Sequence, residues 1–424
     1  MLNVIRRNKK LIIKFDSFKT ISIINDVIRF LNKCKKEGNR NIVFDLCKVK
    51  SQSYTSVHVT LSGVANYYVE NHSFNIEFKT RKNQYVSCTN IKSPRPALNK
   101  KNLFEKNIFD KVITFSNGSE VEFISKQILL QLKKSVECEE GVLVGLSWCI
   151  NEIMDNVLNH SFSKRGYIMA QIHRTTKHIV ISIFDTGIGL YRSILSSNEY
   201  NPTSEVEAIE LVLGKGVTCN KELGQGNGLW GLKEIVKYNH GYLSIMTGRT
   251  NINFDFENNN NNTDFNNNDS NIVDKIPVLD NNNLCTRIDF TLNFSKLIDV
   301  NRALDNYVPF ELITKEVEDM ITETGWLNFK IKDEATEGTG TRSSGMKLRT
   351  YILNMLKIDP SPILLNFENV ETISSSFADE FIGKLILSIG FVQFSTHFRI
   401  INANSFVSGL INKAIIERQN QKNY

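Results

Sequence analysis

Residues 119–185 hold the sequence pattern that most constrains the fold, because two long helical patterns are followed directly by two strand patterns. The helical runs are SEVEFISKQILLQLKKSV and EGVLVGLSWCINEIMDNVLNHS, and the strand-like runs are GYIMAQIHRT and KHIVISIFD. Helices and strands that are apolar on one face bury that face against each other in layers. We therefore expect an α/β sandwich in the middle of the chain.

Smaller α/β units are expected on both sides of this sandwich. Residues 41–49 read as a buried strand, residues 56–69 as a helix and FNIEF as a second strand. Near the other end, PILLNFENV and SSSFADEFIGKLILSIG repeat the order of strand and helix. The expected fold class is α/β, with the central sandwich flanked by smaller α/β domains.

The 424 residues suffice for roughly two to four domains. The proline-containing segment SPRPALNK marks a linker, and the expected domains are 1–112, 113–297 and 298–424. Residues 251–283 contain 14 Asn in 33 positions. We expect an unstructured insertion there, because a polar tract of low complexity cannot offset the entropy of ordering.

Positive charge is concentrated in the N-terminal third of the chain. Residues 1–110 carry 21 Lys and Arg against 8 Asp and Glu, which gives +13 and leaves −7 on the rest of the +6 chain. A nucleic acid or an acidic protein surface could use such a cluster. A solvated lysine-rich face is the favoured alternative, because no recognised nucleic-acid motif accompanies the charge.

Composition and patterning argue against several protein classes. No stretch approaches about 18 consecutive apolar residues, so we expect no membrane-spanning helix. The N-terminus MLNVIRRNKKLIIKF has a short apolar run and no small-residue cleavage site, unlike a signal peptide. Seven scattered cysteines without CxxC spacing argue against a disulfide framework and a zinc site. We expect a cytoplasmic protein with free thiols.

The segment NEIMDNVLNH at 151–160 places three polar side chains on one helix face. Glu152, Asn156 and His160 are spaced four residues apart. A carboxylate beside an amide oxygen can orient a nucleophile and ligate a hard cation such as Mg²⁺. An ordinary polar helix face is the alternative.

The segment FDTGIGL at 184–190 ends a strand at Asp185 and enters a turn with Gly187 and Gly189. A carboxylate fixed at a strand end can accept a hydrogen bond from an exocyclic amine such as N6 of adenine. Glycines let the backbone approach a ligand closely. A tight turn without a ligand is the alternative.

The segment GQGNGLWGLKEIV at 224–236 has glycines at alternate positions, Gly224, Gly226 and Gly228, before a helix. Backbone N–H groups at a glycine-rich helix N-terminus form an anion site suited to phosphates. The segment lacks the preceding strand and the following acidic residue of a dinucleotide-binding fingerprint. We therefore discount a Rossmann fold.

Together and in this order, the three segments resemble the N, G1 and G2 boxes of the GHKL (Bergerat-fold) ATPases, over about residues 115–296. The resemblance implies that the chain binds ATP and Mg²⁺, with Asn156 as the Mg²⁺ ligand, Asp185 on adenine and Glu152 as general base. CTRIDF is similar to the family's Gly-Thr element, with Cys285 in place of Gly. The other implied nucleotide-binding residues are Gly187, Gly189, Gly224, Gly226, Gly228, Leu229 and Thr286.

The C-terminal segment is similar to a STAS-like domain, on the residues GTRSSGMKLR, ILLNFENVETISSSFADEFIGKL and FRIINA. The repeated order of strand and helix leaves a STAS-like fold open for the basic domain 1–112 as well. The resemblance implies a phosphoacceptor at the serine turn of Ser374, Ser375 and Ser376. Here the chain reads Ser-Ser-Ser-Phe where that family usually has Asp-Ser-Ser-Gly. The alternative is a serine run that caps a helix.

The resemblances imply an ATP-dependent serine/threonine kinase of the anti-sigma type that acts in partner switching. Its partner would be a regulatory protein, of STAS type for example, and a homodimer is left open. The alternative is an ATP-dependent conformational switch, or a slow ATPase, that regulates its flanking domains without protein kinase activity. A nucleic-acid partner is less favoured, and no membrane partner is expected.

Overall fold

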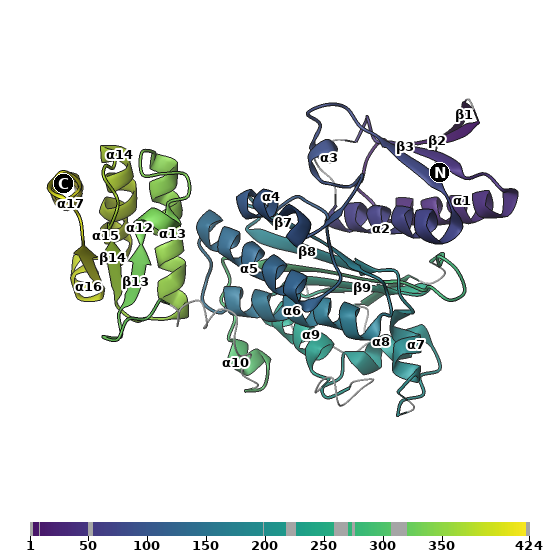
Figure 1. Cartoon of the computed structure of the whole chain (residues 1–424). Coiled ribbons are helices and arrows are strands. Elements are labelled where there is room, and N and C mark those ends of the chain that lie inside the picture. Colours follow the sequence, from purple (N-terminus) through teal and green to yellow (C-terminus); the bar gives the residue numbers. More distant parts are fainter. Residues whose placement is uncertain are drawn as a thin grey trace. The chain divides into compact units, whose positions relative to one another are not determined.

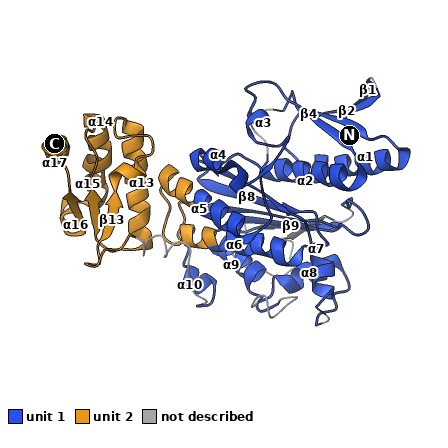
Figure 2. Ribbon diagram, viewed as in Figure 1, with its two compact units in different colours: residues 1–128, 148–293, 298–307 blue, residues 129–147, 294–297, 308–424 orange. Residues whose placement is uncertain are grey.

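The computed structural model describes residues 3–7, 9–49, 54–197, 199–217, 226–257, 270–273, 276–306 and 320–420 (Figure 1). The chain divides into two compact units, which Figure 2 shows in different colours. Helices and strands occur in both units, so the predicted α/β class is confirmed. The first unit comprises residues 1–128, 148–293 and 298–307, and the second comprises residues 129–147, 294–297 and 308–424.

An eight-stranded sheet forms the centre of the first unit. Its strands are β5 (Arg95–Pro96), β6 (Ile113–Phe115), β7 (Gly166–His173), β8 (His178–Asp185), β9 (Tyr242–Thr247), β10 (Thr250–Asp255), β11 (Ser270–Val273) and β12 (Thr286–Asn293). Their spatial order is β11-β10-β9-β12-β8-β7-β6-β5. The two predicted strand runs form the antiparallel pair β7 and β8, and β12 pairs with both β8 and β9.

Helices cover both faces of this sheet (Figure 1). One face packs against α9 (Gly228–Tyr238) and the parts of α5 (Gly118–Ser135) and α6 (Val142–His160) that belong to the first unit. The other face packs against α2 (Thr55–His72). Because successive side chains of a strand point to opposite faces, the β8 residues Ile181 and Ile183 face one layer and Phe184 faces the other.

The N-terminal layer consists of the described residues between 3 and 79. Its sheet has the order β1-β2-β3-β4, formed by Asn3–Arg7, Lys10–Lys14, Asn41–Asp45 and Asn75–Lys79. The helices are α1 (Ser22–Glu37) and α2. The predicted succession of strand, helix and strand is confirmed as β3, α2 and β4, with β3 and β4 parallel.

Helix α2 is apolar on nearly all sides because it lies between two sheets. Its buried side chains share one core with α1, with the N-terminal sheet and with Tyr167 and Phe184 of the central sheet. A side chain at Gly63 would overlap the Phe184 ring. Glycine at this position therefore sets the close approach of α2 to β8.

The prediction that residues 251–283 are unstructured is wrong at both ends of the tract. Strand β10 pairs in register with β9, and β11 pairs with β10. Ile276 and Leu279 lie in the core of α1 and α2. The physical reason is local: Ile252 and Phe254 have the two-residue spacing of a half-buried strand, which the high Asn content obscured. Residues 258–269 and 274–275 lie outside the described residues.

The predicted domain boundaries at residues 112 and 297 stay predictions. Residues 1–128 belong to one compact unit with the central sheet. The N-terminal layer is therefore described together with that sheet.

The second unit contains a three-stranded parallel sheet, β13-β14-β15, formed by Leu327–Lys330, Ile363–Asn366 and Phe398–Ile401. Its long helices are α13 (Arg342–Ile358) and α17 (Ser405–Asn420). Between β14 and β15 come α14 (Ser375–Ala378), a π-helical turn at Asp379–Gly383, α15 (Lys384–Ile389) and α16 (Phe391–His397). The parallel strands connected by helices match the predicted alternation.

Short helices complete the described chain. They are α3 (Tyr85–Cys88), the 3₁₀ helix Leu98–Lys100, α4 (Lys101–Lys106), α7 (Gly189–Leu195), α8 (Glu205–Val212), α10 (Val300–Ala303) and α12 (Ile331–Glu334). Within the described ranges, no helix combines the length and the apolar character needed to cross a bilayer.

Substituting Leu279→Ala tests the corrected view of the Asn-rich tract. Leu279 is fully buried in the core, so truncation should lower the free energy of unfolding by about 2–4 kcal/mol. Asn281→Ala, at an exposed position two residues away, is the matched control and should change it by less than about 0.5 kcal/mol. Chemical denaturation measures both, and equal stabilities of the two variants would contradict the packing of Leu279.

Candidate functional site

A cavity of about 330 Å³ brings the three sequence motifs together on the α6 and α9 side of the central sheet. Eight of the ten predicted site residues line it: Glu152, Asn156, Asp185, Gly189, Gly226, Gly228, Leu229 and Thr286. Gly187 does not line the cavity, and Gly224 lies outside the described residues. Segments more than 70 residues apart in sequence thus meet at one concave site, as the motifs predict.

Helix α6 supplies Glu152 and Asn156, one turn apart. Burial, followed by the charge of Asp155, raises the pKa of Glu152 from 4.5 to about 7. The first residue of α9, Gly228, approaches this carboxylate so closely that an added Cβ would lie 2.7 Å from Oε2. Glycine at 228 therefore lets the N-terminus of α9 and the Glu152 carboxylate share one wall of the cavity.

Asp185 is the last residue of β8 and is only 4% exposed. The backbone N–H of Gly187 donates to its Oδ1 at 2.8 Å. Burial raises the pKa of Asp185 from 3.8 to about 7, although the N–H groups of Gly187 and Thr286 oppose this effect. A carboxylate buried at the edge of a cavity is an acceptor held ready for a ligand donor.

The turn after β8 packs directly on the end of α6. The N–H of Ile188 donates to the Ser161 carbonyl at 2.9 Å, and a Cβ at Gly187 would overlap that same carbonyl oxygen. Only glycine permits this contact. Gly187 therefore affects the site although it does not line the cavity. Its close contact with Ser161 fixes the position of the turn and hence of Asp185, the last residue of β8.

Strand β12 closes the site through Thr286, which lies opposite Asp185 in the ladder. Cys285 occupies the place where the resembled family has Gly, and it adopts a left-handed conformation with φ 55°. Glycine reaches this region without strain, whereas Cys285 places a Cβ there.

Sequence reasoning did not identify several residues that line the cavity. These are Asp155, Asn159, Ser193 and Asn227, whereas His160, which the helix spacing places on the Glu152 face, also lines the cavity. Asn159 and Asp155 lie within the first motif, and Asn227 lies within the third. Their positions beside the motif residues were the available signal. Ser193 belongs to α7, for which no motif gave a signal.

The serine turn of the second unit begins α14. Ser374 Oγ accepts a hydrogen bond from the N–H of Phe377 at 3.0 Å and lies 3.0 Å from Ser376 Oγ. The helix-capping alternative is thus confirmed for Ser374. A phosphoacceptor role for Ser374, Ser375 or Ser376 stays a prediction.

The comparisons with known proteins bear mainly on the second unit. Residues 344–407 match the family model described as "STAS-like domain of unknown function (DUF4325)", which confirms the predicted STAS-like domain there. The solved structure titled "Mycobacterial sensor histidine kinase MprB" is similar, with 17% identity and a TM-score of 0.22, over 42% of this chain and 95% of that one. No curated protein matches the chain.

The buried carboxylates predict how stability depends on pH in the absence of ligand. With pKa values raised to about 7, Asp185 and Glu152 hold protons in the folded chain that the unfolded chain releases near pH 4. Between these values the folded state binds more protons, so the free energy of unfolding falls as pH rises from about 4 to about 7.

Replacing Asp185 by a neutral residue removes the free-energy cost of burying its charge above about pH 7. We expect Asp185→Asn to be more stable than the wild type at pH 8, by about 1–3 kcal/mol, because no charge then has to be buried. At about pH 3 and below the two should be nearly equal, since the Asp185 carboxyl is then protonated in the folded chain and mostly protonated in the unfolded chain. Thermal unfolding across this range measures the difference, and a variant less stable than wild type at pH 8 would contradict the assigned burial cost.

Proposed function

We propose that this chain is an ATP- and Mg²⁺-binding protein of GHKL type. The observation that carries the proposal is the convergence of Glu152, Asn156 and Asp185 with the N-terminus of α9 around one cavity. These are the residues of the three boxes in the family order. A fold resemblance alone would not suffice, because function depends on the site.

The site fits an adenine nucleotide in size and chemistry. A cavity of about 330 Å³ lies within the roughly 300–1,000 Å³ of small-molecule pockets. Asp185 offers a buried acceptor to the adenine amine, and Ile183 and Ile288 add apolar lining. At the other end, Gly228 and Leu229 open α9, whose N–H groups suit phosphate oxygens.

Asn156 fits a role as the protein ligand of Mg²⁺. Within the described part of the chain, no cluster of three His, Cys, Asp or Glu residues could hold a metal ion. Mg²⁺ usually keeps several waters and takes one or two protein oxygens together with substrate phosphates. A single amide oxygen is therefore sufficient, and bound Mg²⁺ would supply neutralisation of phosphate charge.

Glu152 is suited to general base catalysis. Its pKa, raised to about 7 by burial and Asp155, matches the pH at which a base works best near neutrality. In a serine/threonine kinase of the anti-sigma type, Glu152 would take the proton of the attacking hydroxyl. In an ATPase it would take the proton of a water molecule.

A protein partner is the favoured acceptor for a kinase. Ser374 already accepts a backbone hydrogen bond in its own helix cap, and its modification would remove that cap. The STAS-like match of residues 344–407 supports a role in partner switching with proteins of similar fold. The six cysteines described are free thiols, which suits the cytoplasm.

The alternative function is an ATP-dependent conformational switch. The observation in its favour is that the N-terminal layer packs on the same central sheet that carries the site. Nucleotide binding could then reorganise that layer without phosphate transfer to a protein.

Substituting Asp185→Asn tests nucleotide binding. The change replaces an acceptor-only carboxylate by an amide, so ATP affinity should fall about 10- to 100-fold. Titration calorimetry of the full chain at pH 8 with Mg²⁺ and a non-hydrolysable ATP analogue measures this. Unchanged affinity in the variant would remove Asp185 from the adenine pocket and remove the main support for the GHKL assignment.

Substituting Glu152→Ala tests the chemical step. Turnover should fall about 10²- to 10⁴-fold while nucleotide affinity stays near that of wild type, because a base acts mainly on the transition state. Radiolabelled ATP separates the two candidate functions in the wild type. Label on protein supports a kinase, and free phosphate without labelled protein supports the switch or ATPase. Label that persists after Ser374, Ser375 and Ser376 are all replaced by Ala would assign the acceptor elsewhere.

A further inference from the structure

We propose that Tyr67 and Asn283 are positioning residues through which the N-terminal layer sets the nucleotide affinity of the cavity. The inference rests on the proposed nucleotide site. It assigns a structural link between helix α2 and the turn after β8. The link runs through residues 280–285, here called the bridging segment, which precedes β12.

The bridging segment holds the turn after β8 by two hydrogen bonds. Asn283 Nδ2 donates to the Thr186 carbonyl at 2.8 Å, and the N–H of Cys285 donates to the Gly187 carbonyl at 3.0 Å. Thr186 and Gly187 directly follow Asp185, and the Gly187 N–H donates to the Asp185 carboxylate. Any shift of the bridging segment therefore reaches the buried acceptor of the cavity.

The same segment also contacts α7, the helix that follows the turn after β8. Arg192 donates from Nη1 to the Asn282 carbonyl at 3.2 Å. The N–H of Gly248, after β9, donates to the Cys285 carbonyl at 3.2 Å. The bridging segment is thus bonded to three parts of the chain, and two of them, the turn after β8 and α7, adjoin or contain residues that line the cavity.

On its other side, the bridging segment is bonded to α2 through Asp280. The Tyr67 hydroxyl donates to the Asp280 carboxylate. Asp280 Oδ1 in turn accepts from the N–H groups of Asn282 and Asn283 at 2.7 and 2.9 Å. Burial alone would raise the pKa of Asp280, but these donors outweigh it and lower the pKa. The carboxylate is therefore ionised and organises the segment.

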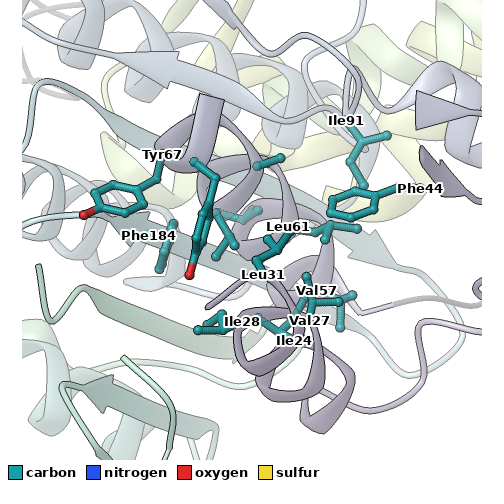
Figure 3. Packing of buried hydrophobic residues seen from close by; sticks show 14 of the residues in the cluster. Ile24, Val27, Ile28, Leu31, Phe44, Val57, Leu61, Tyr67, Ile91 and Phe184 are labelled. Carbon is teal, nitrogen blue, oxygen red and sulfur yellow. The ribbon is translucent and has the colours of Figure 1, made fainter. Parts of the chain in front are cut away.

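Tyr67 is itself fixed within the apolar core of the N-terminal layer. It is 5% exposed and belongs to the cluster that contains Ile28, Leu31 and Phe184. In Figure 3 its ring lies at one side of that cluster, with the hydroxyl directed away from the labelled apolar residues. Its pKa is raised by burial and by Asp280, so the phenol stays protonated as a donor.

The chain of contacts has a thermodynamic consequence. A partner or ligand that moves the N-terminal layer changes the Tyr67–Asp280 bond and hence the turn beside Asp185. By linkage, nucleotide bound at the cavity changes the affinity of the layer for that partner by the same factor. The N-terminal layer then acts as the regulatory domain of the nucleotide site.

The test compares two Tyr→Phe substitutions in the full chain. Tyr67→Phe removes the hydroxyl that bonds Asp280. Tyr85→Phe is the matched control, because Tyr85 is also buried in part and donates to a carboxylate, Asp110, at 2.7 Å. Tyr85 has no hydrogen bond to the bridging segment among the described contacts. Calorimetry with a non-hydrolysable ATP analogue and Mg²⁺ measures affinity for each.

We expect Tyr67→Phe to weaken binding about 3- to 10-fold and Tyr85→Phe to leave it within about twofold of wild type. Asn283→Ala, which breaks the next bond of the link, should weaken binding to a similar degree. KM for ATP should rise in both link variants while kcat stays unchanged, because Glu152 lies on a different element. Amide exchange at Cys285 should quicken in Tyr67→Phe and not in Tyr85→Phe.

The outcomes separate this inference from the proposed function. Wild-type affinity in both Tyr67→Phe and Asn283→Ala would overturn the inference and leave the nucleotide site intact. Equal loss of affinity in Tyr67→Phe and Tyr85→Phe would also overturn it, because a general loss of stability would then explain both. A wild-type chain that binds no nucleotide would overturn the proposed function first, and the inference with it.

Discussion

The alternation of side chains at the end of β8 connects the hydrophobic core of this protein with its cavity. Phe184 points into the core beneath α2, where Gly63 leaves room for its ring. The next residue, Asp185, points to the opposite face and into the cavity. Because a strand cannot shift by one residue without exchanging its faces, packing of Phe184 fixes Asp185 in the site.

The burial of Asp185 destabilises the folded state when its carboxylate is ionised, and a hydrogen-bond donor on a ligand would reduce that destabilisation. Asp185 is buried, and burial raises its pKa to about 7. A buried charge without enough donors is unfavourable. A ligand amine that donates to Asp185 would supply a missing donor, and the Gly187 N–H already supplies one at 2.8 Å. At a pH where Asp185 is ionised, the empty site is therefore less stable than a core of apolar residues would be.

The second unit depends on a different constraint, because its core is a small parallel sheet covered by helices. Leu365 and Phe367 of the β14 region are buried beneath Phe377 and Phe381 of the following helical segment. Ser374 starts that segment by capping α14. The residues that begin this helical segment and fill its core thus lie within the range 344–407 that matches the STAS-like family model.

Much of the fold and site could be predicted from local spacing. The strand β8, the helix α6 and the capping role of Ser374 follow from patterns within about 20 residues. Glu152, Asn156 and Asp185 are predicted site residues because each lies in a short motif, and all three line one cavity. Strand β10 differs from the prediction because Asn251 and Asn253 alternate with Ile252 and Phe254, and the high Asn content of the tract masks that alternation.

The sequence by itself determined which residues share a helix face or a strand face, because those periods of 3.6 and 2 residues are local properties of the chain. It also determined the three motifs and their order. Only the tertiary structure decided that Tyr67 meets Asp280 and Asn283, which lie more than 200 residues later in the sequence. Such contacts depend on how α2 packs against the bridging segment, and no local periodicity encodes that packing.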